Sequence, residues 1–312
     1  MGHRGHPVVG KGTSPVSDRT AFIDAILNNP NDDTARLVFA DWLEEHGEPE
    51  RAEFIRAQIE PAKASDAVRE RNDPDARIAG VHGAAMGGGW RKAIGISETE
   101  GEYVRGFLTD VEVVSTKFLA VAGRALAAEP VTFRMFLPAS DADDLVAWCK
   151  YLSELVASPL LRAVAKLEAR NHAIGAGGFQ HLIASPYLSG LREISFPGVA
   201  ISPSFVKAIS NSPAPFALES LALDRAVQFA RQRTIRLLAS APRFATLKRL
   251  SLRYNRLTDD DIRVLLDSET LPRMLEVDLA GNDFRPREFG RALAERFGYG
   301  CDEDDFEEDD EY

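Results

Sequence analysis

Leucines alternate with polar residues most clearly in residues 247–257, which read Leu-Lys-Arg-Leu-Ser-Leu-Arg-Tyr-Asn-Arg-Leu. Leu250 and Leu252 lie on either side of a serine, and this alternation predicts a short strand with one buried face. Asn255 follows, and its side-chain amide can bond backbone groups that no neighbouring strand satisfies. The segment therefore predicts a strand that ends in a tight turn before Leu257.

The same arrangement repeats along the second half of the chain at steps of 27, 27 and 29 residues. The step separates four prolines, Pro159, Pro186, Pro213 and Pro242. It also separates the apolar strand positions Leu167, Ile194, Leu221 and Leu250, and Val277 continues this series 27 residues later. The turn position holds His172, Val199, Ala226, Asn255 and Asn282, so only the last two units keep asparagine. Two residue series that share an irregular spacing indicate an array of repeated strand–helix units.

The repeated unit resembles the leucine-rich repeat in its long, ribonuclease-inhibitor-like form. This resemblance implies an α/β solenoid with a parallel sheet on its concave face and a helix on the outside of each unit. Helix starts are predicted at Ser202-Pro203, at residues 258–261 (Thr-Asp-Asp-Asp), and at Asp283 with Pro286. The predicted apolar stripes are Phe205 and Ile209; Ile262, Leu265 and Leu266; and Phe289 and Leu293.

Upstream of the array, residues 19–62 predict three short amphipathic helices. Their apolar stripes are Phe22, Ile23, Ile26 and Leu27; Leu37, Val38 and Trp42; and Ala52, Ile55 and Ile59. The first helix is expected to end before Asn29-Pro30, and Asp32 or Asp33 caps the second. The third is expected to begin at Pro49 and to end before Pro61.

These helices resemble the repeat-companion domain, a module at the N-terminus of bacterial proteins, notably of planctomycete type, that often precedes leucine-rich repeats. The resemblance rests on Phe-Ile-Asp-Ala-Ile at 22–26, on residues 33–47 with their Asp-Trp-Leu-Glu-Glu core, and on residues 53–58. Trp90 and the Arg-Gly-Phe of residues 105–107 match further features of similar proteins. The family implies an architecture and provides no catalytic residues.

Residues 63–130 are assigned to a connecting and capping region, residues 131–298 to the repeat array, residues 1–18 to a disordered lead-in and residues 299–312 to an acidic disordered tail. A helix is possible over residues 62–71. The three glycines at 87–89 predict a flexible connection, because neither phosphate-loop glycine pattern is present. Apolar residues between Val104 and Val114 predict one or two strands, followed by a helix at 118–128 and a strand at 131–137.

Charge is concentrated at the C-terminal end. Of the formal net charge of −11, residues 302–311 contribute nine acidic side chains, so the rest of the chain carries −11 + 9 = −2. A nearly neutral body argues against nucleic-acid binding. No apolar run approaches the roughly 20 residues of a membrane span, and the first twenty residues contain no continuous apolar stretch, so we expect no secretory signal there. Cys149 and Cys301 match no zinc spacing, so we expect a reduced, cytoplasmic protein.

No residue pattern predicts a catalytic, metal or cofactor site. Residues 259–261 (Asp-Asp-Asp), and likewise Asp141, Asp143 and Asp144, lack the glycine and distal glutamate of a calcium loop, and acidic residues also favour helix starts. His172 and His181 have no second ligand at motif spacing, and no nucleophile motif is present. Trp42 and Trp148 lie on apolar helix faces and are expected in the core.

The solvent-facing strand positions predict a polar, mixed-charge concave face. The candidate partner-binding residues are Lys166, Glu168, Arg170, Glu193, Arg249, Arg253, Tyr254, Glu276 and Asp278. One interpretation is lateral ion pairing of Arg249 and Arg253 with Glu276 and Asp278. The other is a binding surface with Tyr254 at its rim.

These patterns predict a monomeric, non-catalytic scaffold that binds an as yet undefined protein partner, and neither nucleic acid nor membrane. Curved repeat arrays present broad concave surfaces, which suit partner binding better than they suit enclosing a reaction. Two alternatives stay open: an enzyme with a pocket between the helical module and the first repeats, and a purely structural array. A deep cavity there with a carboxylate of strongly shifted pKa would favour the enzyme.

Overall fold

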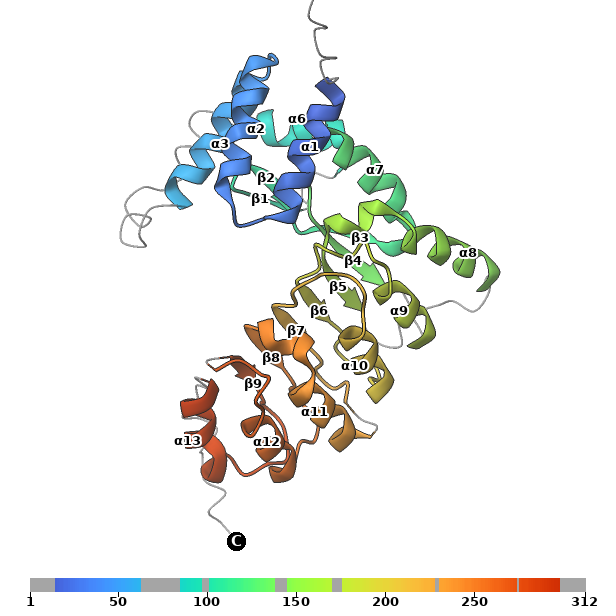
Figure 1. The fold of residues 1–312 in the computed structure, drawn as a ribbon, viewed down its shortest axis with the longest axis vertical. Coiled ribbons are helices and arrows are strands. Elements are labelled where there is room, and N and C mark those ends of the chain that lie inside the picture. The colour runs from blue at the N-terminus through green and yellow to red at the C-terminus, as the bar shows by residue number, and fades with distance from the viewer. Residues whose placement is uncertain are drawn as a thin grey trace, which may run out of the picture.

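The computed structural model describes residues 15–62, 85–96, 101–137, 145–169, 176–227, 230–273 and 275–297. Within these residues a seven-stranded parallel sheet extends along most of the molecule, as Figure 1 shows. Its strands follow one another in chain order: β3 (Val111–Val114), β4 (Phe133–Leu137), β5 (Val164–Ala169), β6 (Glu193–Ser195), β7 (Ser220–Ala222), β8 (Arg249–Ser251) and β9 (Glu276–Asp278). The α/β class expected from the sequence is confirmed.

The strand register follows the spacing of the apolar anchors. Leu167 pairs with Ile194, and the pairing continues through Leu221 and Leu250 to Val277. The sheet also extends further towards the N-terminus than residue 131, where the array was expected to begin. Val113 pairs with Met135, which pairs with Leu167, so β3 lies in the segment assigned to the connecting region.

A helix follows each strand along the sheet. These helices are α7 (Phe118–Ala128), α8 (Leu145–Val156), α9 (Ala176–Ile183), α10 (Pro203–Ser210), α11 (Arg231–Ser240), α12 (Asp259–Leu266) and α13 (Pro286–Phe297). Short 3-10 turns, η1 (Ser115–Lys117), η3 (Pro159–Ala163) and η4 (Pro242–Thr246), connect some of them. In Figure 1, α7 to α10 lie on one side of the strands, and the described residues place no helix on the other side of β4 to β7. Burial alternates along the strands accordingly, because one face packs against the helices.

Two asparagines, Asn255 after β8 and Asn282 after β9, connect consecutive units at the turns. Asn255 is 3% exposed, and its Oδ1 accepts from the backbone N–H groups of Ala226 and Val227 at 2.9 and 2.7 Å. Its Nδ2 donates to the carbonyl of Leu223 at 2.8 Å. Asn282 makes the equivalent contacts one unit later, with the backbone N–H groups of Asn255 and Leu257 and the carbonyl of Leu252. The predicted turn asparagines thus satisfy the backbone of the preceding unit.

A second set of side chains connects the helix ends. The hydroxyl of Ser185 donates to the carbonyl of Val156 at 2.6 Å, and Ser212 donates to Ile183 at the same distance. Ser268 repeats the contact with Ala239 at 2.5 Å. Each serine therefore satisfies a carbonyl at the end of the preceding helix, which would otherwise lack a partner. Ser185 and Ser212 directly precede the periodic prolines.

The N-terminal helices are α1 (Pro15–Asn28), α2 (Asp33–Glu45), α3 (Pro49–Ala62) and α6 (Ala85–Ile94). Asp32 caps α2 as predicted, accepting from the N–H of Thr34 at 2.9 Å. Three expectations for these elements are wrong. Residues 15–18 were assigned to the disordered lead-in, but they form the first turn of helix α1. Helix α3 continues through Pro61, and the glycines at 87–89 lie inside α6 instead of a loop.

The expected stripe of α2 is also partly wrong. Val38 is 47% exposed, whereas Phe39, Ala40 and Leu43 are buried. The helix is rotated because Phe39 contacts two elements at once: its ring stacks on Phe22 of α1 at 5.5 Å and on Phe107 at 6.0 Å. Trp42, expected in the core, is half-buried and packs against the smaller core.

Helix α1 joins the helical module to the sheet. Ile23 and Leu27 belong to the main core of the sheet, whereas Ile26 belongs to a smaller core with Phe39 and Ile55. Polar contacts reinforce this joint: Arg162 of η3 pairs with Asp24 at 2.7 Å. Helix α1 therefore contacts the first units of the sheet at α7 and η3.

A two-stranded hairpin, β1 (Glu102–Val104) and β2 (Phe107–Thr109), lies between the two cores. Phe107 packs into the core of the helical module, and the next residue, Leu108, packs into the core of the sheet. The hairpin turn has positive φ at Arg105 (52°) and Gly106 (89°). A Cβ at Gly106 would lie 2.7 Å from Cα of Ile55, so glycine permits the hairpin to approach α3. The Arg-Gly-Phe sequence thus docks the hairpin onto the helices.

Several sequence expectations concern residues outside the described ranges: the lead-in up to residue 14, the possible helix at 63–71, Asp141, Asp143 and Asp144, Arg170, His172, and the acidic tail at 299–312. The side chains of Trp148 and Cys149 are likewise not described. None of the helices formed by the described residues is long and apolar enough to cross a membrane.

Candidate binding surface

The polar side of the sheet carries most of the residues predicted to bind a partner; we call it the open face. It comprises the strand side chains directed away from the helices: Glu112, Arg134, Lys166, Glu168, Glu193, Ser195, Ser220, Arg249, Ser251, Glu276 and Asp278. Arg249 and Glu276 are exposed, and Lys166, Glu193 and Asp278 are half-buried. Glu168 differs from the expectation: it is only 7% exposed, because cationic neighbours on two strands enclose its carboxylate.

Ion pairs join the open face across several strands. Arg134 of β4 contacts Asp110 at 2.7 Å and Glu168 of β5 at 3.8 Å. Lys166 lies 3.8 Å from Glu168 and 4.0 Å from Glu193 of β6. The structure therefore places Lys166, Glu168 and Glu193 in one chain of alternating charges. The pairs with Asp110 and Glu193 are partly exposed to solvent and contribute little to stability, whereas Glu168 is buried between its two cations.

The two arginines of β8 and its turn pair differently from one another. Arg253 lies 3.6 Å from Asp278, which confirms one of the two expected lateral contacts. Arg249 instead donates to Glu193 at 3.1 Å, so the expected pairing with Glu276 is wrong. The side chain reaches across β7 because the residue in register there is Ser220, whose side chain is small.

A column of equivalent turn residues borders the open face. Gly198, Arg225, Tyr254 and Gly281 each lie four residues after the strand anchor of their unit, with φ of 71°, 53°, 54° and 68°. Glycine adopts this left-handed conformation without strain, whereas arginine and tyrosine do not. Two middle units therefore have a strained side chain where their neighbours have glycine, and such strain is typical of functional positions.

Tyr254 is the large exposed aromatic residue of this column, with 46% of its surface accessible. The guanidinium carbon of Arg225 lies 4.6 Å from its ring centroid, and that of Arg253 lies 5.6 Å away. Tyrosine and arginine are the residue types that most often anchor protein interfaces. The sequence pattern predicted Tyr254 as a binding residue but not Arg225. Arg225 could have been found from its spacing, because it follows Leu221 by four residues as Tyr254 follows Leu250.

Gly281→Ala is expected to destabilise the protein by about 1–2 kcal/mol. The alanine would have to adopt a φ of 68°, and its Cβ would lie 2.3 Å from Cδ1 and Cε1 of Tyr254. Gly123→Ala is the matched control: its Cβ meets only Leu160 at 3.8 Å, inside helix α7, and alanine there is expected to stabilise by about 0.5–1 kcal/mol. Urea denaturation measures the free energy of unfolding of both variants. The prediction is contradicted if the two substitutions change this free energy in the same direction.

A cavity of about 140 Å³ lies where the helical module meets α6 and α7, the place expected for an enzyme pocket. Its two carboxylates are already paired, Glu48 with Arg19 and Glu129 with Arg51. Burial raises the pKa of the neighbouring Tyr103, and the charge of Glu129 adds to this effect, so the phenol stays protonated at neutral pH. Both carboxylates are therefore engaged in ion pairs, and the pair of Arg51 with Glu129 joins the helical module to α7.

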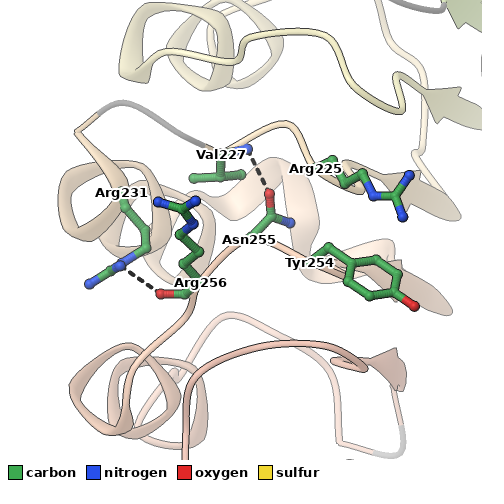
Figure 2. A pocket seen from close by; sticks show the side chains of 6 residues that line it. All are labelled: Arg225, Val227, Arg231, Tyr254, Asn255 and Arg256. Carbon is green, nitrogen blue, oxygen red and sulfur yellow. Dashed lines mark hydrogen bonds between the residues drawn. The ribbon is translucent and has the colours of Figure 1, made fainter.

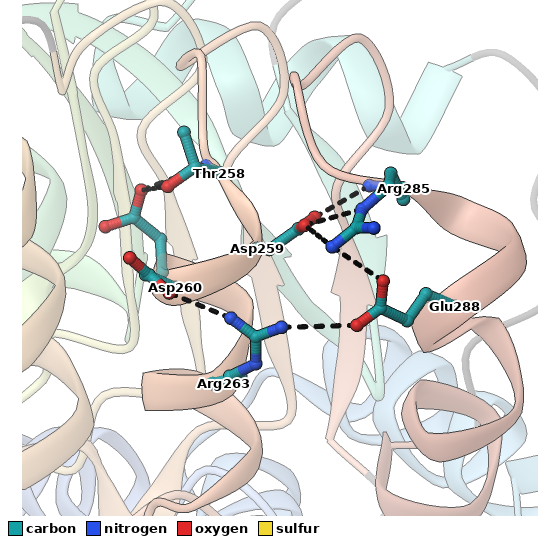
Figure 3. A network of polar contacts seen from close by, with 7 residues as sticks. Thr258, Asp259, Asp260, Arg263, Arg285 and Glu288 are labelled. Carbon is teal, nitrogen blue, oxygen red and sulfur yellow. Dashed lines mark hydrogen bonds and ion pairs between the residues drawn. The ribbon is translucent and has the colours of Figure 1, made fainter.

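The acidic residues 259–261 are accounted for by helix capping and ion pairs, as Figure 3 shows. Asp261 accepts from the backbone N–H and the hydroxyl of Thr258 at 2.9 and 3.0 Å. Hydrogen bonds from Arg285 lower the pKa of Asp259. Arg263 contacts Asp260 and reaches Glu288 of α13. This network connects the last two helices and leaves the three carboxylates engaged.

Within the described part of the chain, no group of three or more His, Cys, Asp or Glu side chains is arranged to hold a metal ion. Comparison with known proteins adds no assignment: no protein-family model matches the chain, and no curated protein is significantly similar to it.

Proposed function

We propose that the chain is a leucine-rich repeat solenoid that acts as a non-catalytic scaffold and binds a protein partner on its open face. The observation that carries this proposal is a broad polar strand surface that no described helix covers between β4 and β7 (Figure 1). Such surfaces are the usual binding sites of repeat arrays.

The repeat assignment is supported by three independent regularities. The strands are parallel and in chain order, with anchors 27 to 29 residues apart from Leu167 to Val277. Asn255 and Asn282 repeat the same contacts to the preceding turn. Ser185, Ser212 and Ser268 repeat the same contact at the helix ends.

We assign the N-terminal helices to the repeat-companion type and give them the role of a cap. Repeat arrays need their first unit covered, because its apolar edge is otherwise exposed. Ile23 and Leu27 of α1 contribute to the sheet core beside Phe118 and Phe133, which fits this role.

The proposal is tested by reversing two charges, Arg249→Glu on the open face with Arg253→Glu in the turn that borders it. The intact chain is used to capture partners from a native lysate, and bound proteins are identified by mass spectrometry. We expect the double variant to lose the partner while keeping its melting temperature, because both side chains lie at the surface.

The matched control is Lys207→Glu with Arg236→Glu, which makes the same change of net charge on exposed positions of α10 and α11. This control is expected to retain the partner. If the open-face variant still captures it, or if both double variants lose it, the open face is not the binding surface.

A further inference from the structure

A cavity of about 360 Å³ lies at the carboxyl ends of β7 and β8, beside the start of helix α11 (Figure 2). It is lined by Arg225, Val227, Arg231, Tyr254, Asn255 and Arg256. Three of these six residues are arginines and none is acidic. The volume falls in the range of small-molecule sites, and the carboxyl ends of parallel strands are a common place for them.

Two of the arginines lie close together at one end of the cavity. Figure 2 shows the side chain of Arg256 next to Val227, between Arg231 and Asn255. Among the described residues, the Arg256 guanidinium has no hydrogen-bond or ion-pair partner. No carboxylate of the described residues therefore neutralises its positive charge.

Arg231 is held in place beside it. Its Nε lies 2.7 Å from the buried carboxylate of Asp261, and its Nη1 donates to the backbone carbonyl of Arg256 at 2.6 Å. These contacts fix the plane of the guanidinium and use two of its three nitrogens. Within the described residues Nη2 has no bonded partner, which leaves it available to an acceptor oxygen.

The other end of the cavity is formed by the stacked pair Arg225 and Tyr254, which Figure 2 shows extending together on the far side of Asn255. Asn255 cannot bind a ligand through its amide, because that group is bonded to the backbone of the preceding unit. It forms the floor between the two ends.

The backbone around this cavity is strained. Arg225, Ala230, Tyr254 and Arg256 all have φ between 48° and 56°. Only six non-glycine residues of the described chain have positive φ, and four of them lie here. Side chains kept at positions that favour glycine indicate that the side chains themselves are required.

We propose that this cavity binds a phosphate monoester, with the phosphoryl group between Arg231 and Arg256 and the group that carries it against Tyr254 and Arg225. A phosphoryl group bears a charge of about −1.5 to −2 at neutral pH and offers three acceptor oxygens. Two guanidinium groups, one at the first residue of α11 and one in the turn after β8, match it, whereas a carboxylate would satisfy only one of them. This proposal is independent of the open face, so either can fail without the other.

The test is isothermal titration calorimetry on the full chain with three probes: inorganic phosphate, glycerol 3-phosphate and a capped phosphoserine tripeptide. Glycerol and the unphosphorylated tripeptide are the ligand controls. We expect Arg256→Ala to weaken binding of the phosphorylated probes at least tenfold and Arg225→Ala to weaken the esters severalfold. Arg233→Ala, an exposed arginine of α11 outside the cavity, is expected to leave binding unchanged.

Preference for glycerol 3-phosphate would identify a free ester as the ligand, and preference for the tripeptide would identify a phosphorylated partner; both support the site. Circular dichroism melting checks each variant. If Arg256→Ala melts early, Arg256→Lys, which keeps the charge but loses the planar fork, replaces it and is expected to weaken binding severalfold. Absence of binding by every phosphorylated probe at 10-millimolar concentration, or equal weakening by Arg233→Ala, would overturn the proposal.

Discussion

Asn255→Ala is expected to lower the free energy of unfolding by about 3 kcal/mol. The side chain is 3% exposed and satisfies three backbone groups of the preceding unit: two N–H groups at Ala226 and Val227, and the carbonyl of Leu223. Alanine leaves all three buried without a partner. A buried polar group left unsatisfied costs more than the mean worth of its hydrogen bond.

Urea denaturation measures the loss, with Asn282→Ala as the matched control. Asn282 makes equivalent contacts to Asn255, Leu257 and Leu252, but it is half-buried in the last unit. Water can bond some of the backbone groups that Asn282 leaves unpaired, so we expect Asn282→Ala to lower the free energy of unfolding by about half as much as Asn255→Ala. A cost below about 1 kcal/mol for Asn255→Ala would show that the turn is held by packing and not by the amide.

The sequence predicted the turn asparagines but not the direction in which they bond. From the local pattern, Asn255 was expected to turn its own chain; its amide instead bonds residues 28 to 32 positions earlier. Long-range contacts of this kind leave no local signal. They also explain how the unit with Ala226 lacks an asparagine of its own, because its turn is bonded by the asparagine of the following unit.

The start of the sheet could not be read from the spacing. The anchors from Leu167 onwards are 27 to 29 residues apart, but Val113 and Met135 are separated by 22 residues and Met135 and Leu167 by 32. An irregular spacing hides a repeat even where the strands pair in register. The strand expected at 131–137 is present as β4, but the segment expected to hold one or two strands between Val104 and Val114 holds β2 and β3 and the end of β1.

The glycine run and Pro61 were misread for a related reason. Local propensity disfavours helix at both places, yet tertiary packing overrides propensity where an amphipathic helix has a partner. Trp90 in the middle of α6 contacts Phe54 of α3 with ring centroids 5.3 Å apart, so the two helices stabilise each other. At the candidate site, alternation placed the open-face residues correctly, but side-chain reach, as in Arg249 across Ser220, requires coordinates.

Glu129→Ala is expected to destabilise the protein by about 3–5 kcal/mol, the largest effect predicted for a single substitution. Arg51 of α3 is 6% exposed, and its Nη2 lies 2.5 Å from the carboxylate of Glu129 at the end of α7. Without Glu129 the guanidinium is a buried charge with no partner. The rings of Phe54, Trp90, Tyr103 and Phe107, at 4.4 to 5.7 Å from its carbon, compensate only in part.

The ion pair joins the helical module to the sheet. Its removal is therefore expected to destabilise the helical module more than the strands far from it, in addition to lowering the stability of the whole chain. Hydrogen exchange is expected to show α2 and α3 losing protection before β5 to β9. A double variant, Arg51→Met with Glu129→Met, should recover much of the stability, because an apolar pair replaces a buried ion pair at little cost.

Arg56→Ala is the control for an ordinary ion pair. Arg56 contacts Asp41 and Glu44 at 2.6 and 2.7 Å, but all three side chains are exposed, and we expect a loss below about 0.5 kcal/mol. Both single variants are compared by urea denaturation of the full chain. If Glu129→Ala costs no more than Arg56→Ala, water reaches Arg51, and the joint between the module and the sheet depends on the apolar contacts of Ile23 and Leu27.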